Sequence, residues 1–479
     1  MADQLGARSL PAYGNAVVRS PHLDRLAEEG VVFERALCAS PLCAPSRASL
    51  MTGLLPSRTA VYDNAGELPA AVPTFAHHLR AAGYRTVLAG KMHFIGPDQL
   101  HGFEERLVPD VYPAGFDWVP DWRLEDDETL PWYHDLGSVL RAGPVRRTLQ
   151  LGYDAEVRKQ ACRAIAESAR DPERPLLLVA SFTHPHDPYE VPPEYWNLYD
   201  ADEIDAPAHA EPPDPVDPPT RRLRGMLASD EVDVTEEHVA AARHGYYGAI
   251  SLVDDHVGAI RAALAAHGLA EDTVILFTSD HGDMLGERGL WYKMAPFEGS
   301  VRVPLLVHAP GRFGAGRVDA PVSLLDLLPT LVDLAGAAKP GTVDGVSLVE
   351  ALEGGAAPER DVPVEYLAEG VRAPQVTLVR GSRKLVRSFG EPDLAYDVES
   401  DPYERTSGSD DELARVADAR WDLAALDAEV RESQERRRLV SAALFAGTLT
   451  PWDHPGTPGG PYIRTGDDFW STLEAAREP

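Results

Sequence analysis

The sequence predicts an α/β fold in which helices flank a large, mainly parallel sheet, with a smaller α+β unit near the C-terminus. Two observations support this prediction. Short apolar runs of strand length alternate with helical stretches over the first 360 residues, a pattern typical of parallel sheets with helices on both faces. Clusters of polar residues follow directly after several of these runs, which is where ligands collect in such sheets.

The expected elements alternate along the chain. A helix begins at Ser20 and Pro21, an N-cap residue followed by a proline suited to the first turn, and ends at Gly30. Further helices are expected over residues 73–82, 154–170, 235–267 and 324–335, with the longest bent near Gly248 and Gly258. Strands are expected over residues 31–33, 84–89, 175–182, 273–278 and 303–308.

Three segments are expected. Residues 1–360 form the large domain, and its first strand is truncated because Met1 to Gln4 read as a strand end without the preceding apolar residues. Residues 361–410 form a small β-rich unit with a hairpin turn at Gly381 and Ser382. Residues 411–479 comprise a charged helix over 411–440 and a Pro- and Gly-rich extended tail from residue 449, which we expect to contact a second subunit.

The net charge, the lengths of the apolar runs and the number of cysteines limit the partners and the location of the chain. The formal net charge of −31 and the isoelectric point near 4.8 argue against nucleic acid and anionic membrane surfaces. No apolar run is long enough to span a bilayer, and no signal peptide is evident. Three cysteines, Cys38, Cys43 and Cys162, are too few for a disulfide framework, which favours a reducing compartment such as the cytoplasm.

The strongest local signal is the stretch SPLCAPSRASLMTG, residues 40–53. Prolines two residues before and after Cys43 hold it in a turn, and a helix is expected to follow with Ser46 as its N-cap. Cys43 then lies beside free N–H groups that favour negative charge, and Arg47 can reach the same spot. A structural cysteine at a helix start is the alternative interpretation. The combination predicts chemistry on an oxyanion.

Polar clusters follow four expected strands: Asp3; Lys91 with His93; His184 with His186 and Asp187; and Asp280 with His281. Lys293 follows the last cluster. Each cluster alone is more often explained by structural hydrogen bonds or by turns than by catalysis. Because the carboxyl ends of parallel strands meet at one edge of a sheet, the clusters together predict an active site there.

The motif that begins at Cys43, C-x-P-S-R-x-x-x-L/M-x-G, resembles the signature of the type I sulfatases of the alkaline phosphatase superfamily. The motifs GYRTVLAGKMH, THPHDP and SDHGDMLGER resemble further sulfatase motifs. The stretches GKMHFIGPDQLHGFEERL and RWDLAA are similar to the choline sulfatase subfamily. The resemblance extends along nearly the whole chain and implies an alkaline phosphatase-like fold.

This resemblance implies a sulfate ester hydrolase in which another enzyme oxidises Cys43 to formylglycine. The hydrated aldehyde is then expected to attack sulfur and later to expel sulfate. Arg47 and Lys91 are expected to hold the nucleophile, and His93 to accept the proton that starts the collapse. The residues expected to bind sulfate and protonate the leaving alcohol are His184, His186 and Lys293.

A divalent cation is also implied, bound by Asp3, Cys43, Asp280 and His281. The family often has two adjacent aspartates near the start of the chain, whereas Gln4 follows Asp3 here. Calcium is the usual family metal. Histidine in place of the common asparagine at position 281 allows manganese as well.

A small-molecule sulfate ester, choline sulfate, is the expected substrate, and a homo-oligomer is the expected assembly. Aromatic faces and a carboxylate recognise a quaternary ammonium, and the candidates are Trp118, Trp122, Trp132 and His134 with Glu365 or Glu369. Core packing is the alternative for the tryptophans. A phosphonate or phosphate ester hydrolase, and an inactive choline-binding homologue, are the alternative functions.

Overall fold

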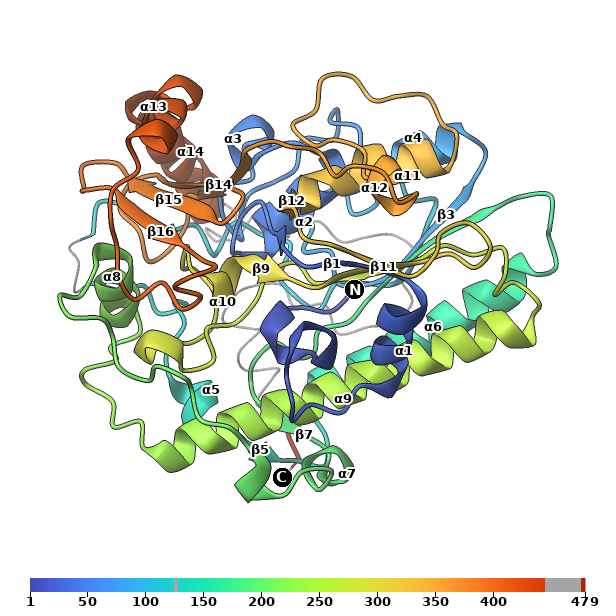
Figure 1. Ribbon diagram of the computed structural model, residues 1–479, viewed down its shortest axis with the longest axis horizontal. Coiled ribbons are helices and arrows are strands. Elements are labelled where there is room, and N and C mark those ends of the chain that lie inside the picture. The colour runs from blue at the N-terminus through green and yellow to red at the C-terminus, as the bar shows by residue number, and fades with distance from the viewer. Residues whose placement is uncertain (125–127, 444–474, 479) are drawn as a thin grey trace.

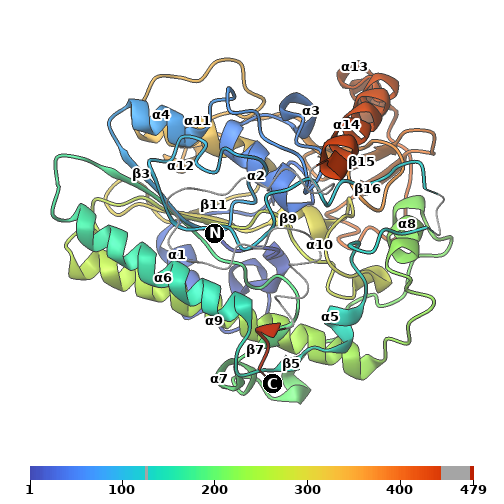
Figure 2. The ribbon, with the colours of Figure 1, turned by 180° about the vertical axis from the view of Figure 1, so that it is seen from behind.

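The computed structural model describes residues 1–124, 128–443 and 475–478. A central sheet lies between two layers of helices (Figure 1). One layer contains α1 (Pro21–Glu29), α6 (Leu149–Ser168) and α9 (Glu236–Ala266). The other contains α2 (Cys43–Thr52), α4 (Phe75–Ala81) and α11 (Leu327–Leu334), and the view from behind shows the same two layers (Figure 2).

Two groups of strands form the sheet. In the first, β3 (Arg85–Gly90) pairs in parallel with β4 (Glu105–Val108) and β6 (Leu176–Ser181). In the second, β10 (Leu305–His308) pairs antiparallel with β8 (Ile275–Thr278) and with β1 (Val31–Phe33), and β1 is parallel to β11 (Gly316–Val318).

Residues 1–3 join the two groups. The Met1 amino group donates to the carbonyl of Ala180 at 2.6 Å, and the Ala2 N–H donates to the carbonyl of Thr278 at 2.9 Å. Parallel bridges pair Ala2 with Ser279 and Asp3 with Pro185. The order is therefore β4-β3-β6-(1–3)-β8-β10-β1-β11, and among these strands β10 alone is antiparallel. This arrangement confirms the predicted mainly parallel α/β fold and brings Asp3 beside the ends of β6 and β8.

Apolar side chains fill the space on both faces of the sheet. Ile250 and Val253 of α9 are buried in one cluster with Phe277 of β8. Met51 of α2 and Leu88 of β3 are buried in a second cluster. Each such side chain contributes about 1.5–3 kcal/mol on burial, so these clusters hold the helices against the sheet.

The helix α9 runs unbroken through Gly248 and Gly258, so the bend expected there is not observed. Glycine serves close packing instead. A Cβ on Gly245 would lie 2.1 Å from the carbonyl oxygen of Tyr189, and one on Gly258 would lie 2.4 Å from the ring of His22. The small residues therefore let α9 approach the segments that it covers.

A four-stranded antiparallel sheet forms the smaller C-terminal unit, with β13 (Val362–Tyr366), β14 (Gln375–Arg380), β15 (Arg383–Ser388) and β16 (Leu394–Asp397) in that order. The hairpin predicted at residues 381–382 connects β14 to β15. The prediction of a single helix over residues 411–440 is wrong. This segment is divided into α13 (Asp411–Arg420) and α14 (Leu423–Ala443), because Trp421 is extended and its indole donates to Glu365 at 2.7 Å.

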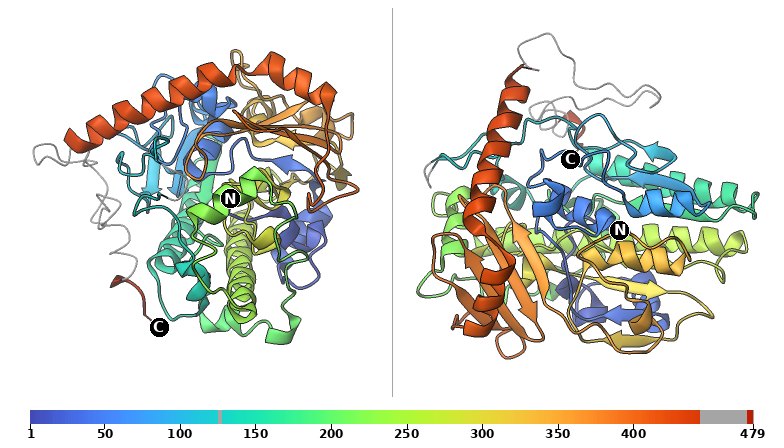
Figure 3. Two further views of the ribbon diagram at one scale, coloured as in Figure 1. Left: turned by 90° about the vertical axis from the view of Figure 1, so that its left-hand side faces the viewer. Right: turned by 90° about the horizontal axis from the view of Figure 1, so that it is seen from above.

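The helix α14 reaches back from this unit to the aromatic-rich insertion within residues 97–150 (Figure 3). Arg431 donates to the carbonyl of Trp122 at 3.0 Å, and Arg438 donates to the carbonyl of Pro120 at 2.7 Å. Of the tail expected from residue 449, residues 449–474 and 479 lie outside the described part of the chain. Within 475–478, Glu478 pairs with Arg147 as an antiparallel bridge.

Short elements complete the chain: β2 (Ala36–Leu37), β5 (Gly143–Pro144), β7 (Glu190–Val191), β9 (Arg302–Val303), β12 (Val322–Ser323), α3 (Pro56–Thr59), α5 (Gly137–Leu140), α7 (Pro193–Trp196), α8 (Pro218–Met226), α10 (Glu298–Val301) and α12 (Val349–Leu352). None of the helices within the described ranges has the length and apolar character needed to cross a bilayer.

Candidate active site

Cys43 is the first residue of α2, not the residue before a helix capped by Ser46 as the sequence predicts. The N-cap is Leu42, which makes no side-chain cap. Ser46 lies inside the first turn, and its hydroxyl donates to the carbonyl of Asp280 at 2.6 Å. This bond ties the start of α2 to the loop after β8, so Cys43 is fixed against that loop.

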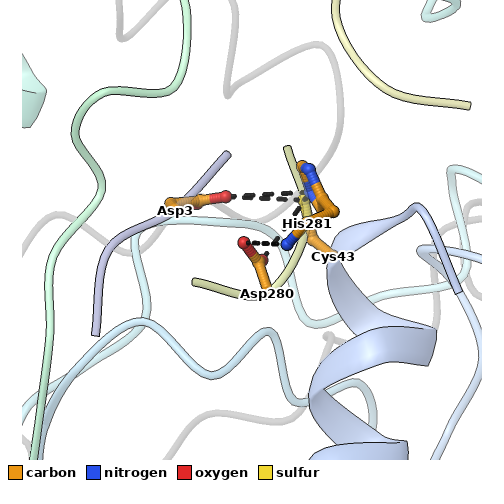
Figure 4. A group of neighbouring side chains, drawn as sticks. All are labelled: Asp3, Cys43, Asp280 and His281. Atoms are coloured by element: carbon orange, nitrogen blue, oxygen red, sulfur yellow. Dashed lines mark hydrogen bonds and ion pairs between the residues drawn. The ribbon is translucent and has the colours of Figure 1, made fainter. Parts of the chain in front are cut away.

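Asp3, Cys43, Asp280 and His281 converge on one point (Figure 4), with one ligand atom of each within 4.8 Å of the others. Cys43 Sγ lies 3.2 Å from His281 Nε2 and 3.9 Å from Asp3 Oδ1. All four side chains are buried. Two carboxylates and an imidazole are donors that suit a divalent cation, so these residues fit the metal site that the sequence predicts.

Two buried cations neutralise the carboxylates. Arg47 Nε lies 2.8 Å from Asp280 Oδ2, and Lys91 forms an ion pair with Asp3. Burial alone would raise the pKa of Asp280, but Arg47, His281 and Lys91 together hold it well below its usual range. Burial and the nearby Asp280 carboxylate raise the pKa of Asp3. Of the two carboxylates, Asp3 is therefore the one that an additional positive charge would stabilise more.

Lys91 reaches this point because Gly90 ends β3 in a backbone conformation that favours glycine. Its φ is +112°, and a Cβ there would lie 2.0 Å from the carbonyl oxygen of Ser181. The Lys91 ammonium lies 3.5 Å from Cys43 Sγ and 3.9 Å from the centre of the Tyr112 ring. Even so, burial raises the pKa of the Cys43 thiol to about 12.

Lys293 is the centre of a second group of polar residues. Its ammonium lies 2.7 Å from Gln4 Oε1, 2.8 Å from His186 Nε2 and 3.2 Å from His134 Nε2. Burial, followed by the charge of Lys293, lowers the pKa values of His134 and His186 well below the usual range. Both imidazoles are therefore neutral, and their bare Nε2 atoms accept the Lys293 hydrogens.

A cavity opens at Cys43 beside the Lys293 group. Its lining includes Lys293, His186 and Asp187, together with aromatic rings and a carboxylate from distant parts of the chain. These further lining residues include Tyr112, Trp118, Trp132, His134 and Glu369. Of the predicted substrate residues, the structure thus brings Trp118, Trp132, His134 and Glu369 to Cys43.

Trp122 and Glu365 do not line this cavity. The Trp122 indole donates to the carbonyl of Ala368 at 2.9 Å. Glu365 accepts hydrogen bonds from the backbone and hydroxyl of Ser57 and from the Trp421 indole. Both side chains thus join the C-terminal unit to the large domain, a structural role that their residue types do not reveal in sequence.

His93 and His184 are buried at their strand ends but also lie outside the cavity lining. The His93 ring stacks on Tyr112 with centres 5.0 Å apart. Burial, followed by the charge of Lys91, lowers the pKa of His93 to about 3, so this imidazole is neutral. His184 Nδ1 lies 2.7 Å from Asp154 Oδ2.

Sequence reasoning missed several residues of the site, among them Gln4, Tyr112 and Asn64. The only signal for Gln4 was its place directly after Asp3. Tyr112 is one of many aromatic residues in the insertion and has no motif of its own. Asn64 accepts a hydrogen bond from the backbone of Ala44 at 3.0 Å, which holds the first turn of α2.

The chain matches the family model described as sulfatase over residues 1–337. Residues 286–423 match the C-terminal model of N-sulphoglucosamine sulphohydrolase, and residues 428–477 match the C-terminal model of the choline sulfatase enzyme. The chain therefore belongs to the sulfatase family and is a sulfuric ester hydrolase, as the motif at Cys43 predicts.

Within that family, the chain is 46% identical over 478 residues to a choline-sulfatase of Rhizobium meliloti (strain 1021), covering 95% of this chain and 92% of that protein. An arylsulfatase of Clostridium perfringens (strain 13 / Type A) is 29% identical, with 85% and 88% covered. Among solved structures, the phosphonate monoester hydrolase of Agrobacterium radiobacter superposes with a TM-score of 0.66 at 26% identity, with 92% and 94% covered.

Proposed function

We propose that this sulfatase hydrolyses choline sulfate to choline and sulfate. The observation that carries the proposal is the lining of the cavity at Cys43, which combines basic groups with a buried carboxylate and aromatic rings. The 46% identity to a choline-sulfatase over nearly the whole chain supports the same substrate.

Glu369 supports a cationic leaving group. It is 1% exposed, and neither of its carboxylate oxygens has a hydrogen-bond partner among the residues that the structure describes. Burial raises its pKa to about 7. An unpaired buried carboxylate is costly, and a quaternary ammonium can neutralise it without donating a hydrogen bond. Trp118 and Trp132, whose rings stack 6.4 Å apart, offer faces to the same cation.

Lys293 is our candidate for the proton donor to the departing alcohol. It is the cationic group of its cluster, since His134 and His186 are neutral. The three acceptors around its ammonium hold it in one position. Arg47 and Lys91 supply further positive charge close to Cys43, at the Asp280 and Asp3 carboxylates.

Cys43 requires modification to serve as the nucleophile. A thiol whose pKa is about 12 stays protonated at neutral pH and attacks poorly. We propose that a formylglycine-installing enzyme oxidises Cys43, which supplies a hydrated aldehyde with a reactive hydroxyl. Asp3, Asp280 and His281 would hold a divalent cation, Ca²⁺ or Mn²⁺, that neutralises sulfate charge when bound.

The main alternative is hydrolysis of a phosphonate ester, which the similarity to a phosphonate monoester hydrolase favours. Comparing kcat/KM for choline sulfate, 4-nitrophenyl sulfate and a phenyl phosphonate monoester separates the two. We expect choline sulfate to be the best substrate by at least about tenfold, equivalent to about 1.4 kcal/mol. A preference for the phosphonate ester would overturn the proposal. The cytoplasmic location and the homo-oligomer stay predictions.

A further inference from the structure

One buried carboxylate holds the loop that follows β6. Asp154, in the second turn of α6, is fully buried and faces four donors. Its Oδ1 accepts from the Thr183 backbone N–H at 2.7 Å and from the Thr183 hydroxyl at 3.0 Å. Its Oδ2 accepts from the His184 backbone N–H at 3.0 Å and from His184 Nδ1 at 2.7 Å.

The held loop contacts both halves of the site. The His184 carbonyl accepts from the backbone N–H of Asp3 at 3.3 Å, which positions the start of the chain. Two residues further on, His186 Nε2 lies 2.8 Å from Lys293 Nζ. A shift of this loop would therefore move a candidate metal ligand and the support of the candidate proton donor together.

The same carboxylate fixes the orientation of the His184 ring. Because a carboxylate only accepts hydrogen bonds, Nδ1 of His184 carries a proton that it donates to Asp154. Nε2 is buried and has no hydrogen-bond partner among the described residues. The role of His184 in leaving-group protonation, expected from sequence, stays a prediction.

We propose that Asp154 is a positioning residue for the hydrolysis, acting through His184 to fix Asp3 and His186. This inference rests on the proposed sulfate ester hydrolysis but not on choline as the leaving group. Supporting groups of this kind contribute about 10–100-fold to metal affinity or activity in other enzymes. The bonds to charged Asp154 are also of the stronger type, since one partner is ionised.

The chain offers a matched control. Asp254 is equally buried and accepts from two consecutive backbone N–H groups, those of His22 at 3.1 Å and Leu23 at 2.7 Å, at the start of α1. Asp154→Asn places an amide donor against the N–H groups of the loop, whereas Asp254→Asn does the same at a site outside the cavity. We expect kcat on 4-nitrophenyl sulfate to fall about 10–100-fold in Asp154→Asn with little change in KM, and to stay within about twofold in Asp254→Asn. Equal activity losses in both, following their losses of Tm, would overturn the proposal.

A second pair of variants keeps the test decisive if Asp154→Asn does not fold. His184→Asn keeps an N–H donor close to the position of Nδ1, and His184→Leu removes it. A positioning role predicts that His184→Asn retains activity within about threefold of the wild type, while His184→Leu loses about 10–100-fold. Equal losses of activity in His184→Asn and His184→Leu would indicate that the imidazole itself is catalytic and would contradict the inference.

The signal of the His184 Nδ1 proton gives a readout that needs no turnover. In protein labelled with ¹⁵N-histidine, we expect a strongly downfield imidazole N–H signal in the wild type and in Asp254→Asn, and its loss in Asp154→Asn. If choline sulfate is not hydrolysed, the proposed substrate fails while this signal and the aryl sulfate assay still test Asp154. Retention of the signal in Asp154→Asn would contradict the assigned hydrogen bond.

Discussion

Glu369→Gln is the variant that tests the leaving-group side of the cavity most directly. The carboxylate of Glu369 is buried in the lining of the cavity that also contains Trp118 and Trp132, and its pKa is raised to about 7 from an ordinary 4.5. A cation in the cavity binds the ionised form only. Since Glu369 gains a proton below pH 7, affinity for choline sulfate must weaken as the pH falls, and glutamine must remove this dependence.

The size of the effect follows from the shift in pKa. A raise from 4.5 to about 7 costs about 3 kcal/mol when the carboxylate is charged in the folded protein. A bound ammonium that recovers this energy returns the pKa toward its ordinary value. The KM for choline sulfate is then expected to rise about tenfold between pH 8 and pH 6. The isosteric glutamine is also expected to raise the free energy of unfolding by up to about 3 kcal/mol at pH 8, with the gain vanishing near pH 4.5.

The assay is a pair of pH profiles of KM, for choline sulfate and for 4-nitrophenyl sulfate, in the wild type and in Glu369→Gln. The neutral aryl leaving group controls for titration on the sulfate side, and urea unfolding at pH 8 and pH 5 reports the stability difference. A choline sulfate KM that is flat with pH in the wild type, or that is unaltered by glutamine, would refute the assignment of Glu369 to the cation.

Three further changes test other parts of the structure. Cys43→Ala should lower kcat at least about 10³-fold with an unchanged circular dichroism spectrum, and peptide mass spectrometry of active protein should find an aldehyde or its hydrate at position 43; full activity with an unmodified thiol would contradict the proposed nucleophile. Lys384→Met should lower the free energy of unfolding by about 3–5 kcal/mol in urea, because it leaves Glu298 and Glu404 buried without their ammonium partner at 3.1 and 2.7 Å; an unchanged midpoint would show that this cluster contributes nothing net. EDTA should lower both Tm and turnover, with recovery on adding Ca²⁺ or Mn²⁺, and Asp280→Asn should abolish that recovery; indifference to EDTA would argue against a metal held there.

Much of the site follows from sequence because its residues sit at the ends of apolar runs. Asp280, His281 and Lys91 each follow closely after the end of a strand, and parallel strands present such ends at one edge. The exact start of α2 did not follow, because the Ser46 hydroxyl bonds to the carbonyl of Asp280 across 234 residues of chain. A local capping rule cannot include a partner that distant.

The sequence alone could not distinguish the residues that line the cavity from similar residues nearby that do not. Trp118 and Trp122 lie four positions apart in one aromatic segment, yet only Trp118 lines the cavity. Glu365 and Glu369 are likewise four apart, and Glu365 is bound by Ser57 and Trp421. Which member of each pair is available depends on tertiary contacts with α14 and α3, and these contacts leave no periodic signal in the sequence.

The cavity at Cys43 is formed by two sets of segments that are constrained to different degrees. Its reactive half comes from strand ends and from α2, where Arg47 and Ser46 both donate hydrogen bonds to Asp280 and tolerate little change. Its other half comes from an irregular insertion and from the turn after β13, which carry the aromatic rings and Glu369. Substitutions in these peripheral segments, in evolution or by engineering, can therefore change which alcohol the enzyme accepts as leaving group. The residues that carry out the chemical step stay the same.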